Sequence, residues 1–226
     1  TRWNDSTTPT IIWINSISLW RLRNEFRSFN HNTNLRWHIM FNDGRSKKVV
    51  FIAHCFLNQN SISDGTAIYP SAFRSLIDYF LNADIGIVQM PCPELFCLGL
   101  DRGDLHGADR PVVVENTRIR SEMKSKIHNT ELINLAGYVV QQILEYKKHG
   151  FEIIGIIGAN RSPTCGVDTT SNDNAEVNGM GLFMNEISHQ ISRENVSISM
   201  IGLKGNENIQ EKLDQLLCQE SIANNP

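Results

Sequence analysis

Short apolar runs alternate with longer segments of helical periodicity from Lys47 to the end of this chain, and this alternation constrains the fold more than any other feature. Such runs are typical of strands buried in a parallel sheet, because each crossover between parallel strands needs a connection of helix length. We expect strands over residues 48–54, 84–90, 151–158 and 196–203. We expect helices over residues 70–81, 175–193 and 208–217, and a long helical stretch that ends at Lys148. The sequence therefore predicts an α/β protein with three layers, in which a mainly parallel sheet of about four to five strands has helices on both faces.

The first 46 residues differ from the rest in composition. They hold all four tryptophans and six arginines against three acidic residues, a net charge of +3, so the remaining residues carry −3 − 3 = −6. We therefore expect residues 1–46 to be an N-terminal extension, accessory or poorly ordered, and residues 47–226 to form the α/β domain. A helix that docks on this domain and a processed leader are the alternatives.

The overall charge and hydropathy argue against several classes of partner. The chain has a formal net charge of −3 and a sequence pI near 6.1, so no cationic surface for a nucleic-acid polymer is expected. No run of about 18 or more uncharged apolar residues occurs, so we expect no membrane span. The five cysteines are odd in number and widely spaced, which favours a reducing, cytoplasmic compartment over a disulfide framework.

Three of the cysteines follow three different predicted strands. Cys55 comes directly after the first strand, Cys92 comes directly after the second, and Cys165 lies in the loop that leaves the third. The carboxyl ends of parallel strands meet at one edge of a sheet, where open α/β sheets bind ligands. A free cysteine is often only a small core residue, which is how we interpret Cys97 and Cys218. Three cysteines at three strand ends nevertheless favour a common site.

Three converging thiolates indicate a centre for a soft metal. Thiolate ligands select zinc, copper(I) or iron–sulfur clusters. A structural zinc usually needs a fourth protein ligand and tends to use Cys-x2-Cys pairs, and the sequence has no such pair. A [4Fe–4S] cluster with three cysteine ligands would instead leave one iron open to a substrate atom. We therefore expect a [4Fe–4S] cluster, with zinc as the alternative cofactor.

The sequence blocks around these cysteines resemble a known family. The blocks are His54-Cys55-Phe56-Leu57 with Asp64-Gly65, Cys92-Pro93-Glu94 with Gly99-Leu100 and Arg102, and Ser162-Pro163-Thr164-Cys165-Gly166. Over about residues 48 to 170, their order and spacing resemble the 2-thiouracil desulfidase family, formerly a domain of unknown function. The resemblance implies that Cys55, Cys92 and Cys165 hold a [4Fe–4S] cluster whose open iron takes the sulfur of a thiolated nucleobase.

The resemblance also implies roles for further residues. Glu94 would be the catalytic acid/base and Ser162 the second catalytic group, while Asp64 and Arg102 would contact the substrate; Asp64 is also typical of a turn. The expected reaction is hydrolytic, with Glu94 carrying a proton from water to the leaving sulfide. The partner is then a small thiolated molecule rather than a polymer.

Two other classes of function remain open from the residues alone. A cluster or zinc site could serve a structural or sulfur-carrying protein without turnover, which metal analysis would separate from the enzyme. Alternatively, Cys92 or Cys165 could act as a nucleophile, since each lies near a possible helix start that would lower its pKa. Insensitivity to oxygen and chelators would favour that second version.

Overall fold

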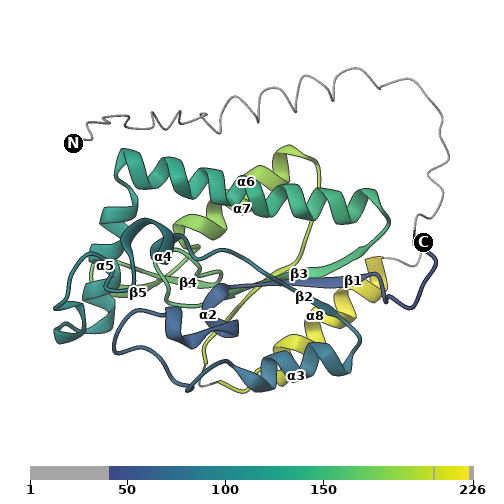
Figure 1. Cartoon of the computed structure of the whole chain (residues 1–226), viewed down its shortest axis with the longest axis horizontal. Helices are drawn as coiled ribbons and strands as arrows, with labels where there is room; N and C mark the ends of the chain where they lie inside the picture. The colour runs from purple at the N-terminus through teal and green to yellow at the C-terminus, as the bar shows by residue number, and fades with distance from the viewer. Residues whose placement is uncertain (1–40, 206, 224–226) are drawn as a thin grey trace, which may run out of the picture. The chain divides into compact units, whose positions relative to one another are not determined.

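Four parallel strands form the central sheet in the part of the chain that the structure, a computed structural model, describes: residues 41–205 and 207–223 (Figure 1). In chain order the strands are β1 (Lys48–Ile52), β2 (Gly86–Gln89), β3 (Glu152–Ala159) and β6 (Met200–Leu203). Across the sheet their order is β2-β1-β3-β6, and each neighbouring pair is parallel. The predicted α/β class with a mainly parallel sheet is confirmed. Of the predicted extension, residues 1–40 lie outside the described residues.

The two middle strands are buried because they are apolar on both faces. In β1, Val50, Phe51 and Ile52 have no exposed surface, and Ile156 and Ile157 of β3 are equally covered. Strands buried on both faces need layers of helix above and below the sheet, as the continuous apolar runs in the sequence predict.

Helices supply those two layers. Figure 1 shows α6 (Lys126–Lys148) and α7 (Leu182–Arg193) on one face of the sheet, and α3 (Arg74–Asn82) and α8 (Gln210–Ala223) on the other. The long helix α6 packs against α7 and β3, and the apolar stripe predicted for it is the side that is buried. Among the helices of the described residues, none is long and apolar enough to cross a membrane.

The predicted helix over residues 175–193 is wrong in its first part. Two short strands, β4 (Thr169–Asn172) and β5 (Ala175–Asn178), form an antiparallel hairpin there, and α7 begins only at Leu182. The hairpin turn consists of Asp173 and Asn174, which both have positive φ, a conformation that Asp and Asn tolerate better than most residues.

The helical stretch that ends at Lys148 is two helices rather than one. Helix α5 (Val112–Met123) ends before Ser125, whose hydroxyl accepts the backbone N–H of His128 and so caps the start of α6. Around the carboxyl ends of the strands lie four shorter segments, which are α2 (His54–Leu57), η1 (Gln59–Ser61), α4 (Pro93–Leu98) and η2 (Gly107–Asp109). Figure 1 shows α4, α5 and the β4–β5 hairpin gathered at one end of the sheet.

Candidate functional site

The connections that leave β1, β2 and β3 each carry one cysteine to the same cavity. Cys55 lies in α2, Cys92 directly precedes α4, and Cys165 lies in the loop after β3. All three line a cavity of about 550 Å³, counted with the space that opens to solvent. Because β1 lies between β2 and β3, the strand order reverses here, and such a switch point is where open α/β sheets bind ligands.

Local hydrogen bonds fix two of the three cysteines. The sulfur of Cys92 accepts the backbone N–H of Leu95 at 3.4 Å and so caps the start of α4. The backbone N–H of Cys165 donates to Ser162 Oγ at 2.9 Å. Gly158 of β3 makes room for this loop, because a Cβ at that position would collide with the carbonyl oxygen of Cys165.

The three thiols lie close enough to affect one another electrostatically. Burial raises the pKa of Cys55 to about 12, and the charges of Cys92 and Glu94 add to the shift. Burial also raises the pKa of Cys165, with contributions from Cys92, Cys55 and Glu94. For Cys92, burial and then Glu94 raise the pKa to about 11, and these outweigh the lowering by the backbone N–H groups of Leu95 and Glu94 at the helix start. Negative charge is costly at this site unless a cation compensates for it.

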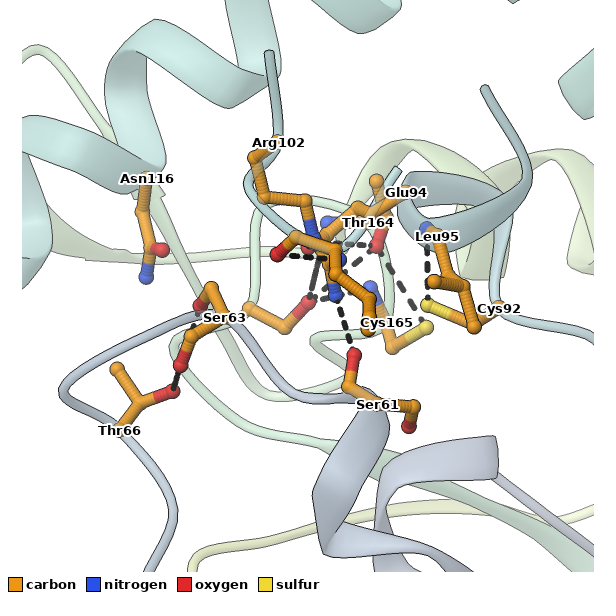
Figure 2. A network of polar contacts seen from close by, with 12 residues as sticks. Ser61, Ser63, Thr66, Cys92, Glu94, Leu95, Arg102, Asn116, Thr164 and Cys165 are labelled. Atoms are coloured by element: carbon orange, nitrogen blue, oxygen red, sulfur yellow. Dashed lines mark hydrogen bonds and ion pairs between the residues drawn. The ribbon is translucent and has the colours of Figure 1, made fainter. Parts of the chain in front are cut away.

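A buried carboxylate, Glu94, stands beside the thiols in the first turn of α4 (Figure 2). Its Oε1 accepts the hydroxyl of Thr164 at 2.5 Å and the hydroxyl of Ser162 at 3.3 Å. Its Oε2 forms an ion pair with Nε of Arg102 at 3.2 Å. Both oxygens are therefore held by side chains that come from other segments of the chain.

The guanidinium of Arg102 hydrogen-bonds to groups of the protein itself. Its side chain is 3 % exposed, and besides Glu94 it binds the carbonyl oxygens of Ser61 at 2.6 Å, Gly99 at 2.6 Å and Leu100 at 3.3 Å. Arg102 lines the cavity, as expected of a substrate contact, but its guanidinium joins the loop around Ser61 to the loop around Gly99. Its contact with substrate stays a prediction.

The structure brings most of the predicted site residues together but leaves Asp64 apart. Cys55, Cys92, Cys165, Glu94 and Ser162 all line the cavity with Arg102. Asp64 is exposed, is not among the residues that line the cavity, and accepts the N–H of Gly65 at 2.8 Å, which is the geometry of a turn.

Two further buried polar residues of the cavity were not predicted. Thr164 is fully buried between Ser162 and Cys165, and it could have been found because it lies inside the block that carries both. Asn116 of α5 is also buried. The sequence did hold a signal for Asn116. It lies three positions before Ile119 and seven before Met123, so it shares the buried side of the helix with them although it is polar.

Three cysteines share one cavity, and thiolates are ligands that select soft metals. Among the residues that the structure describes, no group of three or more His, Cys, Asp or Glu side chains is arranged to hold a single metal ion.

Comparison with known proteins finds one relative of comparable length. The chain is 27% identical over 163 residues to an uncharacterized protein of Methanocaldococcus jannaschii, MJ0003, an alignment that covers 72% of this chain and 90% of the relative. No protein-family model matches the chain. No solved structure matches it either.

Proposed function

We propose that this chain is an iron–sulfur-dependent desulfidase, which removes sulfur as sulfide from a small thiocarbonyl compound such as a thiolated nucleobase. One observation carries the proposal: cysteines from three neighbouring strands share a cavity with a buried glutamate, Glu94, whose carboxylate is bound by two hydroxyl groups. The resemblance of the sequence blocks to the 2-thiouracil desulfidase family supports the same assignment.

We favour the cluster over a single zinc ion because the sequence has no Cys-x2-Cys pair, which structural zinc sites tend to use. Cys55, Cys92 and Cys165 would hold it. When bound, a [4Fe–4S] cluster with three cysteine ligands supplies one iron that no protein group occupies, a Lewis acid with affinity for soft sulfur.

The proposed reaction is hydrolysis without electron transfer. A water oxygen forms a bond to the thiocarbonyl carbon, the carbon–sulfur bond breaks, and the sulfur leaves as hydrogen sulfide with both protons of the water. Glu94 is the group in reach to move one of these protons from the water to the sulfur. Thr164 and Ser162 hold Oε1 of Glu94, and Arg102 holds Oε2, so the carboxylate enters the reaction already oriented.

The first test concerns the cofactor. The protein, reconstituted anaerobically with iron and sulfide, should show the broad visible absorbance of an iron–sulfur cluster and should release sulfide from 2-thiouracil or a related thiolated base. Replacement of Cys55, Cys92 or Cys165 by Ser should remove the absorbance, whereas Cys218→Ser, at an exposed position of α8, should leave it intact.

The second test separates the chemistry from the cofactor. Glu94→Gln and Ser162→Ala should keep the cluster absorbance and lower turnover by about 100-fold or more, the range for a lost general acid/base. Glu122→Gln, at an exposed position of α5, is the matched control and should turn over normally. If the cluster-loaded protein released no sulfide from any thiolated base in a panel, the proposal would give way to a sulfur-carrying or structural role.

A further inference from the structure

The buried amide of Asn116 has a fixed orientation in the cavity wall. Its nitrogen Nδ2 donates to the carbonyl oxygen of Arg161 at 3.3 Å and to Ser171 Oγ at 3.2 Å. Ser171 Oγ itself donates to the Arg161 carbonyl at 2.7 Å, so it can only accept from the amide. The amide therefore cannot flip without losing both bonds, and its oxygen Oδ1 is held on the other side.

That oxygen is an acceptor without a donor. Within residues 41–205 and 207–223, no hydrogen bond to Asn116 Oδ1 is formed, although the residue is only 7 % exposed. Figure 2 shows Asn116 reaching down from its helix with the oxygen turned toward Thr164 and Arg102. The oxygen opens onto the cavity, where a ligand that brings a donor can take the place of water at this acceptor.

The other asparagine that lines the cavity, Asn160, already uses both its oxygen and its nitrogen in hydrogen bonds within the protein. Its Oδ1 already accepts the backbone N–H groups of Val167, Asp168 and Thr169, and its Nδ2 donates to the carboxylate of Asp168. Asn160 therefore shapes the loop after β3, whereas Asn116 offers an oxygen to the cavity.

The loop that faces Asn116 is also rich in acceptors. Thr66 Oγ1 donates its proton to the carbonyl oxygen of Ser63 at 2.6 Å, and Ser63 Oγ lies 3.3 Å from Thr66 Oγ1. With that proton committed, the threonine oxygen has lone pairs but no proton to offer a ligand. Figure 2 shows Asn116, Ser63 and Thr66 on one side of Thr164, and Cys92 on the other.

We propose that Asn116 Oδ1 accepts a ring N–H of the substrate, so that the substrate class is a cyclic thioamide or thiourea that still carries its ring hydrogen. The inference rests on the proposed function and narrows it, since it excludes thiocarbonyl compounds with every ring nitrogen substituted. A site built around a polar partner rejects an analogue that lacks it, because the buried group is then left unpaired.

The test compares three substrates on the reconstituted holoprotein and on Asn116→Ala. 2-Thiouracil has both ring N–H groups, 1,3-dimethyl-2-thiouracil has neither, and 5,6-dimethyl-2-thiouracil has the same added bulk with both N–H groups kept. The unsubstituted protein should prefer the two N–H substrates over the 1,3-dimethyl compound by about 10- to 100-fold in kcat/KM. In Asn116→Ala this preference should fall to a few fold, mainly through a higher KM, while the cluster absorbance stays unchanged.

A preference of the same size in Asn116→Ala would overturn the inference. If that variant fails to fold, binding to the unsubstituted protein decides: uracil and 5,6-dimethyluracil should bind at least about 10-fold more tightly than 1,3-dimethyluracil in calorimetry. Equal binding, or no binding of any of them, would also overturn it.

The outcomes keep the two proposals apart. Sulfide release without any N–H preference leaves the desulfidase standing and removes the role of Asn116. If the protein binds uracil with a preference for the N–H groups but releases no sulfide, the role of Asn116 stands and the desulfidase proposal falls.

Discussion

Thr164 is a buried residue that stands between a carboxylate and a thiol. Its side chain has no exposed surface, and its hydroxyl lies 2.5 Å from Glu94 Oε1 and 3.6 Å from the sulfur of Cys165. A hydroxyl has one proton to donate, and the shorter distance assigns it to the carboxylate. Thr164 therefore sets the direction of the Glu94 carboxylate relative to the cysteines.

We expect Thr164→Val, which keeps the shape of the side chain and removes its hydroxyl, to lower kcat about 10-fold with little change in KM. Thr164→Ser should recover most of the activity because it restores the hydroxyl. The measurement is steady-state sulfide release, with cluster absorbance as the check on assembly. Equal damage from Ser and Val would mean that the methyl group and packing matter rather than the hydrogen bond.

For single residues, the sequence predicted the cysteines of the cavity better than the polar residues beside them. Cys55, Cys92 and Cys165 could be predicted to share a cavity because a parallel sheet brings its strand ends to one edge. The contact of Thr164 with Glu94 and the orientation of Asn116 depend on how loops close over the sheet, which no periodicity in the sequence records. Asp64 was placed by resemblance alone, and its exposed turn lies outside the cavity wall.

Among the elements, α5 holds the loop that carries Arg102. The carboxylate of Glu115 accepts from Arg118 and from Arg110, and Arg118 also donates to the backbone carbonyl of Arg102 at 2.8 Å. The hydrogen bonds from Arg118, and then those from Arg110, hold the pKa of Glu115 below its ordinary value of 4.5. A carboxylate with a lowered pKa stabilises the fold above its unfolded pKa and loses that contribution as the pH falls.

We therefore expect Glu115→Gln to lower the free energy of unfolding by about 1 to 2 kcal/mol near pH 7. The difference from the unsubstituted protein should shrink as the pH falls below about 4.5, because the unfolded chain takes up the proton first and the native carboxylate follows at its lower pKa. Urea unfolding at about pH 7 and about pH 4 measures both values. Glu122→Gln, exposed on the same helix, serves as the control; a deficit for Glu115→Gln that did not depend on pH would contradict the ionic role.

A second prediction at this scale compares two helix glycines. Gly181 caps the start of α7, and a Cβ there would collide with the backbone of Thr164, so Gly181→Ala should destabilise the fold by about 1 to 3 kcal/mol. Gly137 lies inside α6, where a Cβ would meet only the side chain of Gln190 at 3.5 Å. Gly137→Ala should stabilise by roughly 0.5 to 1 kcal/mol through helix propensity. Thermal unfolding should shift in opposite directions, and a neutral Gly181→Ala would show that the loop is free to move.

The elements that the sequence missed are those whose signals are weakest locally. Residues 169–178 are mostly polar and lack the alternation of a half-buried strand pair, so nothing in them outweighed the helical pattern that follows. The hairpin is held by contacts made elsewhere in the chain, since β4 packs on α5 and Thr170 bridges to Arg161. By contrast, β1 and β3 were predictable because their apolar runs can be satisfied only in a covered sheet.

For the whole molecule, the boundary of the extension can be tested at Phe41. This residue falls within the predicted extension, yet its ring meets the rings of Phe151 and His149 edge-on at 5.8 and 5.7 Å. A chain that begins at Phe41 should therefore unfold at the same temperature as the full chain. A chain that begins at Lys47 should be less stable by about 1 kcal/mol, because it lacks this ring contact. An insoluble or unfolded product that starts at Phe41 would place residues 1–40 within the fold.

The three cysteines extend from strands that lie side by side in the order β2-β1-β3, so a centre bound by all of them would staple the middle of the sheet together. A group that binds the native state and not the unfolded chain stabilises the fold by mass action. Loss of the centre to oxygen would then loosen the sheet at the same moment as it ended turnover. Proteases would cleave the form without the centre where it unfolds locally. The lifetime of the protein in the cell would then depend on how long the centre stays bound.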